Sequence, residues 1–307
     1  PTEESAVLDP TVTDPTATTG QLRVGVAGAG PWSHLFHAPM LASHPQTTLS
    51  AVWARRHSAA EEVAGPYGAV AHDSFDRFLD DVDAVAFAVP PDIQAALAPR
   101  AARAGKALLL EKPLALDVAG AEALAQVVDE AGVATQMVLT WRYVPEVRAL
   151  LEAVARTTPV GGRGWFLSGG FLGGPFATPW RLEQGPLYDL GPHVVDLLDA
   201  ALGTVVGIRA HGDRRRWVGL LLEHEGGAVS EASLTGTSPV EPVRAGVEVH
   251  TTEGVLEVAT VGVSASASAT IVDEFVATVL TGTPHPLDVG RGLHLQRLLA
   301  AAAGDLD

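Results

Sequence analysis

The 307-residue chain contains no cysteine, which excludes disulfide bonds, thiolate catalysis and thiolate metal sites. Lysine is almost absent too, because 18 arginines occur beside only two lysines, Lys106 and Lys112. The net charge of −16 argues against a broad surface for nucleic acid or for an anionic membrane. No apolar run approaches the roughly 20 residues of a membrane helix. The sequence therefore predicts a protein that binds no nucleic acid and does not span a membrane.

The composition is that of a globular protein, with 47% hydrophobic and 18% charged residues. The length is sufficient for two domains with substantial cores. Residues 1–20 are rich in proline, threonine and acidic residues, and we expect them to form a flexible tail. They lack the basic start and apolar stretch of a secretory signal, so that the cytoplasm is the expected location.

A glycine-rich turn follows the first apolar strand. The strand Leu22–Ala27 runs directly into Gly28-Ala29-Gly30-Pro31-Trp32-Ser33, a G-x-G-x-x-G pattern with serine in the third glycine position. The first glycine permits a tight turn, and the second lets the backbone approach a pyrophosphate. Taken alone, the pattern also fits a purely structural turn. Its position between a strand and a helix indicates a dinucleotide site.

Strands and helices alternate through the first half of the chain. The predicted elements after the turn are a helix over Trp32–Ser43, strands over Thr48–Trp53, Asp83–Val89 and Lys106–Leu110, a helix over Asp117–Ala131, and a strand over Thr135–Leu139. This alternation predicts a doubly wound parallel sheet in a dinucleotide-binding domain over residues 21–141. Ligands of such sheets bind beyond the carboxyl ends of the strands.

The end of the second strand bears on the choice of cofactor. An NAD-type domain usually places a carboxylate there for the ribose hydroxyls, whereas this chain has Ala54-Arg55-Arg56. Guanidinium groups can bind a 2′-phosphate, so NADP is favoured over NAD, although both arginines could simply be solvated. The residues predicted to bind the cofactor are Gly28, Gly30, Pro31, Trp32, Ala54, Arg55, Arg56, Val89, Pro90, Pro91, Glu111 and Lys112.

The second half of the chain has a different pattern. After a helix over Pro145–Arg156, the predicted strands are Arg163–Phe171, Val205–His211, Trp217–His224, Ala228–Leu234 and Arg244–His250. Several alternate polar and apolar residues, which predicts an antiparallel sheet with one face packed on helices, in a domain over residues 142–307. We expect Ser264–Thr270 to be a loop or strand edge. A closing helix over Val289–Ala303 carries an apolar stripe that should pack on this domain.

Lys112 lies at the exit of an apolar strand, in a chain that uses arginine at nearly all its other cationic positions. The pKa of a lysine falls readily on burial or beside another cation, so that a lysine can exchange a proton near neutral pH, whereas arginine cannot. The alternative is a strand-end lysine that extends its ammonium group to water.

A second candidate lies in the segment Gly185–Asp196. If this segment opens a helix, Asp189 and His193 lie four residues apart on one side of it. The carboxylate could then orient the imidazole and stabilise its protonated form. A capping aspartate with a histidine in the core is the alternative. No third ligand at fixed spacing is evident, so no metal site is predicted.

The order of these motifs resembles the Gfo/Idh/MocA family of NAD(P)-dependent oxidoreductases from Leu22 nearly to the C-terminus. The matching motifs are Gly25-x-x-Gly28-x-Gly30, Val89-Pro90-Pro91, Ala104-Gly105-Lys106, Glu111-Lys112-Pro113, Thr140-x-Arg142-Tyr143-x-Pro145, Trp180-Arg181 and Asp189-x-Gly191-x-His193-x-x-Asp196. The resemblance implies an N-terminal Rossmann domain and a C-terminal α/β domain. The latter has a large, mostly antiparallel open sheet that often supports a homodimer or homotetramer.

The resemblance also implies hydride transfer at a carbon–oxygen centre of a sugar, cyclitol or related polyol. It assigns the catalytic lysine, aspartate and histidine to Lys112, Asp189 and His193. We expect His193 to act as the base, Lys112 to bond the same substrate oxygen, and Asp189 to orient the pair. The residues predicted to bind substrate are Arg142, Trp180, Tyr188, Asp189 and His193. Two departures from the family are Gln94, where a histidine is common, and Gly185-Pro186, which replaces a glycine run.

Two other functions remain open at this stage. One is a non-catalytic NADP(H)-binding sensor or assembly protein, against which the presence of Lys112, Asp189 and His193 together argues. The other is reduction of a non-sugar substrate such as an imine or an unsaturated tetrapyrrole. Trp141, Trp165 and Trp180 could line an apolar pocket, form a stacking platform for a sugar, or pack in the core.

Overall fold

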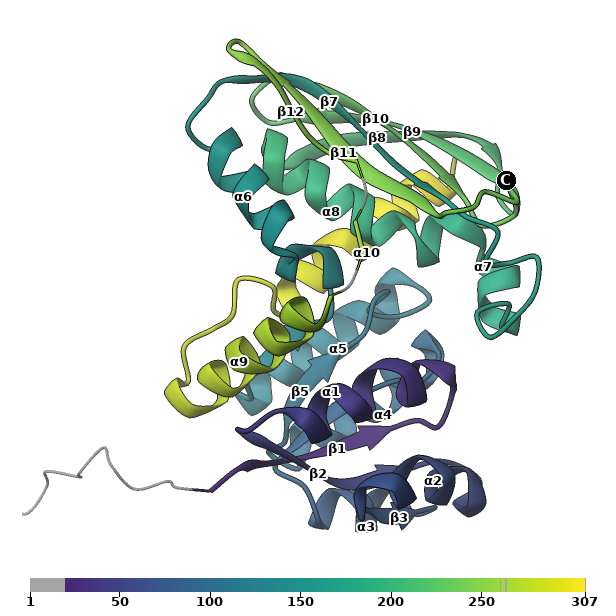
Figure 1. Cartoon of the computed structure of the whole chain (residues 1–307), viewed down its shortest axis with the longest axis vertical. Helices are drawn as coiled ribbons and strands as arrows, with labels where there is room; N and C mark the ends of the chain where they lie inside the picture. The colour runs from purple at the N-terminus through teal and green to yellow at the C-terminus, as the bar shows by residue number, and fades with distance from the viewer. Residues whose placement is uncertain (1–19, 260, 263, 307) are drawn as a thin grey trace, which may run out of the picture.

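The computed structural model describes residues 20–259, 261–262 and 264–306. The predicted tail therefore lies, apart from Gly20, outside the described residues. Two six-stranded sheets are stacked along the long axis of the molecule, the N-terminal one below and the C-terminal one above (Figure 1).

The N-terminal sheet is entirely parallel, with the strand order β3-β2-β1-β4-β5-β6. Its strands are β1 (Leu22–Ala27), β2 (Thr47–Trp53), β3 (Val70–His72), β4 (Ala84–Phe87), β5 (Ala107–Leu110) and β6 (Thr135–Met137). Every residue of β4 and β5 is buried, which explains their continuous apolar sequences. The predicted doubly wound parallel sheet is confirmed.

Helices cover both faces of this sheet. They are α1 (Ala38–Ser43), α2 (His57–Ala64), α3 (Phe75–Asp80), α4 (Pro91–Arg103) and α5 (Val118–Ala131). The predicted helix over Trp32–Ser43 begins differently, because its first turn is a π-helix over Ser33–His37. Asp117 caps α5, and its carboxylate accepts a 2.7 Å hydrogen bond from the Gly120 amide.

The C-terminal sheet has the order β12-β11-β7-β10-β9-β8, and among its pairs only β7 and β10 run parallel. Its strands are β7 (Pro159–Leu167), β8 (Val205–Asp213), β9 (Trp217–His224), β10 (Val229–Thr235), β11 (Arg244–Thr251) and β12 (Gly254–Val258). The predicted large, mostly antiparallel sheet is confirmed. The strand predicted over Arg163–Phe171 is wrong at its end, because Phe171 turns inward and its amide donates to the Gly236 carbonyl at 2.8 Å.

The C-terminal half also contributes five helices among its described residues. They are α6 (Pro145–Val154), α7 (Pro179–Asp189), α8 (Gly191–Leu202), α9 (Ala265–Thr281) and α10 (Val289–Ala303). α8 packs directly on β7, where a Cβ at Gly164 would come within 2.4 Å of Val194. Within the described ranges, none of the helices is long and apolar enough to cross a membrane.

The loop or strand edge predicted over Ser264–Thr270 is wrong, because this segment opens α9. The Ser264 hydroxyl accepts a hydrogen bond of 3.2 Å from the Ala267 amide and caps the helix. The helix then buries Ile271, Val272 and Phe275. Alternating serine and alanine have too little hydrophobic contrast to show a helical period, so the sequence pattern missed this start.

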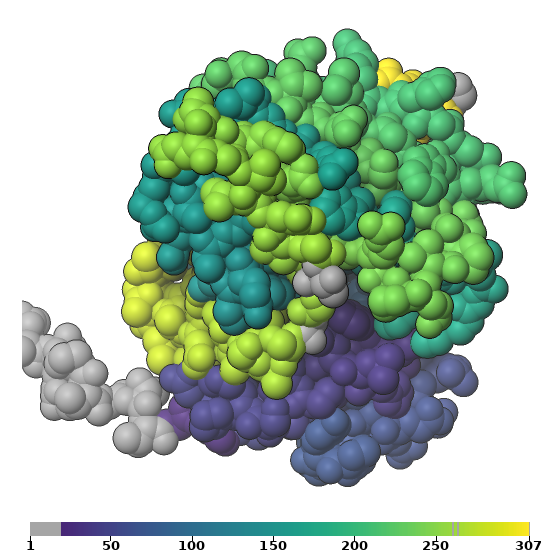
Figure 2. Space-filling model, turned by 45° about the horizontal axis from the view of Figure 1, so that its top comes forward, coloured from purple at the N-terminus to yellow at the C-terminus, as the bar shows by residue number. Residues whose placement is uncertain are grey.

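The last two helices join the two halves of the molecule. The bounds predicted for α10 are confirmed, but it packs on α5 and β6 of the N-terminal half as well as on α8 and β8. α9 contacts α1, and the buried Gln136 side chain donates a 3.0 Å hydrogen bond to the Ile271 carbonyl. In the space-filling view, the yellow-green C-terminal segments lie directly against the purple N-terminal half (Figure 2).

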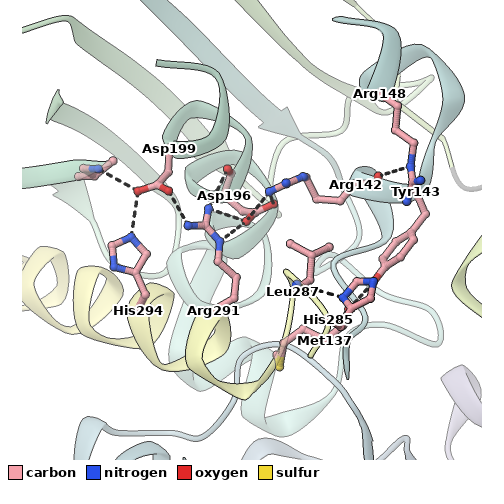
Figure 3. A network of polar contacts seen from close by, with 11 residues as sticks. Met137, Arg142, Tyr143, Arg148, Asp196, Asp199, His285, Leu287, Arg291 and His294 are labelled. Atoms are coloured by element: carbon pink, nitrogen blue, oxygen red, sulfur yellow. Dashed lines mark hydrogen bonds and ion pairs between the residues drawn. The ribbon is translucent and has the colours of Figure 1, made fainter. Parts of the chain in front are cut away.

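Buried ion pairs fasten α10 to α8 (Figure 3). The Arg291 guanidinium donates from Nε to Asp196 at 2.7 Å and from Nη1 to Asp199. His294, one turn further along α10, lies 2.9 Å from Asp199. Burial acts to raise the pKa of Asp199, but the His294 hydrogen bond and the Arg291 charge outweigh it and lower this pKa to about 2. Asp199 is thus charged at neutral pH, and Arg291 holds both aspartates of α8.

We expect Arg291→Met to lower the free energy of unfolding by about 3–5 kcal/mol at neutral pH, because it removes the cation that two buried carboxylates share. The matched control is Arg297→Met on the same helix, which removes an exposed pair with Glu122 and should cost less than about 1 kcal/mol. Urea denaturation followed by circular dichroism measures both. Equal losses in the two variants would contradict the assigned role of Arg291.

The same pairing predicts a pH dependence. Because the folded-state pKa of Asp199 lies below its ordinary value of 3.8, this group stabilises the fold above that value. Its contribution is lost as the pH falls from about 4 toward 2. The Arg291→Met variant should therefore lose less stability than the wild type across this interval.

Candidate active site

Two adjoining hollows of about 520 and 500 Å³ lie beyond the carboxyl ends of β1, β2 and β4, and they share Gly30 and Arg55 in their linings. Gly28 has a φ of +130°, and a Cβ there would lie 2.3 Å from the Ala88 carbonyl oxygen. Only glycine permits this turn. A Cβ at Gly30 would meet nothing within 4 Å, so this residue faces open space. The hollows thus form a groove with a glycine floor, which suits a dinucleotide.

All the residues predicted to bind the cofactor line this groove. Arg55 and Arg56 are exposed at the end that follows β2. Within the described part of the chain, neither guanidinium pairs with a carboxylate. Both are therefore available to a phosphate group of a ligand.

A third hollow of about 310 Å³ lies next to the groove, between the two halves of the molecule, and Lys112, Asp189 and His193 all line it. Lys112 Nζ donates to both Oδ1 and the backbone oxygen of Asp189, each at 2.8 Å. Arg181 Nε lies 3.1 Å from the other carboxylate oxygen of Asp189. This substrate cavity, as we call it below, therefore contains one buried carboxylate between two cations.

The electrostatics of this cluster follow from burial and charge. Burial acts to raise the pKa of Asp189, but the charges of Lys112 and Arg181 outweigh it, so that this pKa is lowered and the group is ionised. Burial lowers the pKa of His193 well below its usual value, and the Lys112 charge lowers it further, against the smaller opposing effect of Asp189. His193 is consequently neutral at physiological pH.

The predicted relation between Asp189 and His193 needs correction. They do not share one helix, since Asp189 is the last residue of α7 and His193 lies in the first turn of α8. Gly185, with a φ of +73°, bends the chain before them, and a Cβ there would lie 2.0 Å from the Arg214 carbonyl oxygen. The carboxylate binds Lys112 and Arg181 instead, and His193 is not held in a protonated form. The imidazole stacks on Trp141, with ring centroids 5.3 Å apart.

A second set of contacts holds the backbone around Lys112. Glu111 accepts hydrogen bonds from Trp32 Nε1 at 2.7 Å and from the amide of Lys112 at 3.2 Å, and its carboxylate lies 2.9 Å from His37 Nε2. Glu111 was predicted to bind the cofactor; it lines the groove, but its carboxylate already has these partners.

Gln94, which occupies the position where the family resemblance leads one to expect histidine, is fully buried beneath this turn. Its amide nitrogen donates to the carbonyls of Glu111 and Leu114 at 2.8 and 3.0 Å, and its oxygen accepts from the Glu111 amide at 2.8 Å. Gln94 thus fixes the strand exit from which Lys112 projects.

The remaining residues predicted to bind substrate do not line the substrate cavity. Trp180 lines the groove, with the Arg181 guanidinium 4.7 Å above its ring. Arg142 is directed away from the substrate cavity, because its guanidinium binds the buried Asp196 at 3.2 Å and lines another hollow. Tyr188 is buried in α7 and is not among the residues that line the substrate cavity. Trp141 lines that cavity, whereas Trp165 does not.

Sequence reasoning missed two kinds of cavity residue. Arg181 could have been found, because it belongs to a motif already noticed and a buried carboxylate needs cations. Trp32 and Trp141 were already candidates for the cofactor site and for a pocket wall, but three phenylalanines gave no signal, since they come from segments without a motif: Phe166, Phe171 and Phe176.

Known proteins share both halves of this architecture. Residues 22–139 match the model of the oxidoreductase family with an NAD-binding Rossmann fold, and residues 146–257 match the GFO/IDH/MocA C-terminal domain. GenD2 from gentamicin A biosynthesis, solved in complex with NAD, has a TM-score of 0.83 at 24% identity, with 98% of this chain and 97% of that chain covered.

Two relatives are similar in sequence. The dTDP-3,4-didehydro-2,6-dideoxy-alpha-D-glucose 3-reductase of Streptomyces violaceoruber is 31% identical over 206 residues, which is 63% of this chain and 58% of the relative. The inositol 2-dehydrogenase of Rhizobium meliloti is 33% identical over 135 residues, which is 43% of this chain and 40% of that enzyme. The two alignments thus cover about three fifths of the first relative and two fifths of the second. The two family matches follow each other along the chain and coincide with its two sheets, and the chain therefore belongs to the Gfo/Idh/MocA family of oxidoreductases with an NAD-binding Rossmann fold.

Proposed function

We propose that this protein is an NAD(P)-dependent oxidoreductase that acts on a hydroxyl or keto carbon of a sugar-like substrate. The observation that carries this proposal is the position of Lys112, which lines both the dinucleotide groove and the substrate cavity. A cofactor in the groove and a substrate in the cavity would meet at this side chain. In this proposal residues 21–141 bind the cofactor and residues 142–307 complete the substrate site.

The roles of the side chains follow from their charge states. A nicotinamide held in the groove would accept a hydride from the carbinol carbon in the oxidative direction, and the substrate hydroxyl would give its proton to the protein; the reductive direction would reverse both transfers. Neutral His193 can accept that proton. Lys112 uses two hydrogen bonds on Asp189 and retains a third N–H for the substrate oxygen. Asp189 positions Lys112 in this proposal.

The activities of the two relatives support a reaction at a carbon–oxygen centre on a ring. One is a reductase of a dideoxy keto sugar linked to dTDP, and the other is a dehydrogenase of a cyclitol. The presence of both a reductase and a dehydrogenase leaves the direction to be measured.

We expect NADPH to bind more tightly than NADH, because Arg55 and Arg56 can each form a charge-assisted contact with the 2′-phosphate, worth about 1.5–3 kcal/mol. Fluorescence titration of both cofactors measures this difference. The double variant Arg55→Ala/Arg56→Ala should remove it, whereas Arg103→Ala, at an exposed arginine outside the groove, should not. Equal affinities in the wild type, or an NADH preference that persists in the double variant, would refute the assignment.

We expect His193→Asn to lower kcat by about 10²–10⁴ with nearly unchanged cofactor affinity, because the titratable group is lost. In the wild type, the lowered pKa of His193 keeps the base neutral, so oxidation should lose activity only well below about pH 6.5. The control His211→Asn changes an exposed histidine of β8 and should retain full activity. If His193→Asn kept the wild-type kcat, the proton acceptor would be Lys112 or water instead of His193.

Lys112→Arg and Lys112→Met should both lose most activity while the protein stays folded and binds NADPH. The guanidinium remains protonated and its planar group is larger than an ammonium, so that it cannot replace the lysine between the groove and Asp189. The other lysine provides the control: Lys106 donates to the Val82 carbonyl at 2.8 Å, and Lys106→Arg should remain active. Near-normal turnover of Lys112→Arg would show that Lys112 supplies only charge.

A further inference from the structure

The walls of the substrate cavity are mainly apolar. Five aromatic side chains line it, namely Trp32, Trp141, Phe166, Phe171 and Phe176, together with four aliphatic ones. Trp141 stacks on both Phe166 and His193, with ring centroids 5.2 and 5.3 Å apart, so that the three rings form one wall. An occupant of about 310 Å³ therefore meets flat hydrocarbon surfaces over most of its area.

The charged groups of this cavity bind one another. Asp189 is held by Lys112 and Arg181, and Glu111 is held by Trp32, His37 and the Lys112 amide. The remaining groups are one N–H of Lys112, the terminal guanidinium N–H groups of Arg181 that Thr178 does not occupy, the neutral imidazole of His193, and the hydroxyls of Thr140 and Ser168. Of these hydroxyls, Ser168 already accepts a 3.4 Å hydrogen bond from the Gly170 amide.

A polyol needs acceptors as well as donors, and Lys112 and Arg181 supply only donors. Each hydroxyl that is buried without a hydrogen bond weakens binding by roughly tenfold. Asparagine, whose amide both donates and accepts, does not occur anywhere in the chain. The seven glutamines include none that lines the substrate cavity. A ring with a hydroxyl on every carbon would leave several of them unpaired against aromatic walls.

We propose that the substrate is a hydroxyl-poor cyclic ketone or secondary alcohol, such as a deoxygenated sugar ring or another largely apolar ring. This inference rests on the hydride-transfer function proposed above and narrows its substrate class. The reacting oxygen faces Lys112 and His193, and the apolar side of the ring packs on Trp141 and Phe166. The hydride and proton transfers are those given above, and no further co-reactant is required.

Two probes with the same carbon ring test this inference. Cyclohexanol carries a single hydroxyl, and myo-inositol carries one on every carbon. Binding of each to the protein saturated with oxidised cofactor is measured by calorimetry, independently of turnover. We expect cyclohexanol to bind at least about tenfold more tightly than myo-inositol. Equal affinities, or tighter binding of myo-inositol, would overturn the inference.

Turnover separates this inference from the proposed function. Nicotinamide absorbance is followed with both alcohols and with cyclohexanone in the reductive direction. Tighter binding of cyclohexanol without any hydride transfer would uphold the substrate class and count against the proposed function. Turnover of myo-inositol with a higher kcat/KM than cyclohexanol would uphold the function and overturn the substrate class.

A variant at the cavity rim provides a second test. Val243 lines the cavity but is 48% exposed, so that Val243→Asn adds an amide without disturbing the core. It should narrow the affinity ratio between the two alcohols by about threefold or more, by strengthening myo-inositol binding. The matched control is Val206→Asn on β8, 65% exposed and outside the cavity, which should leave the ratio unchanged. An unchanged ratio in Val243→Asn would contradict the inference.

Discussion

The ion pair between Lys112 and Asp189 is the contact on which the candidate site depends. Lys112 follows the last residue of β5 by two positions, and Asp189 ends α7, so the pair joins the two halves of the molecule at their boundary. Buried ion pairs are stabilising only where good geometry and further hydrogen bonds compensate for desolvation. Here Arg181 supplies the additional partner. Burial, together with the charge of Lys112, lowers the pKa of His193 and keeps this imidazole neutral.

This pair requires the two sheets to be held in a fixed relation. α9 and α10 provide that relation, because both return from the C-terminal half to pack on the N-terminal one. Arg291 ties α10 to α8 through Asp196, and α8 begins two residues after Asp189. The packing of α10 on α8 therefore helps to set the position of the candidate site. A loss of the Arg291 contacts would disturb the position of α8 and with it His193.

The family and the cavity give complementary information about function. Membership of the Gfo/Idh/MocA family establishes an oxidoreductase fold with an NAD-binding domain. The walls of the cavity restrict what can bind there. Aromatic surfaces beside a small polar cluster favour an occupant with one reactive oxygen and few others. The same catalytic residues can thus serve different substrates on one fold, since the surrounding side chains select the molecule.

Local sequence pattern was sufficient for the parallel sheet, the glycine turn and the bounds of α10, because continuous apolar strands and a helical stripe depend on neighbouring residues. It also identified Lys112, Asp189 and His193 as a group through the family motifs. It could not reveal that Asp189 binds Lys112, 77 residues away in the chain, nor that Arg142 turns away to Asp196. It missed α9, whose first turn lacks hydrophobic contrast, and the three phenylalanines of the cavity wall, which come from separate segments. Ion pairing and cavity shape depend on side chains that only folding brings together, and the tertiary structure alone decided them.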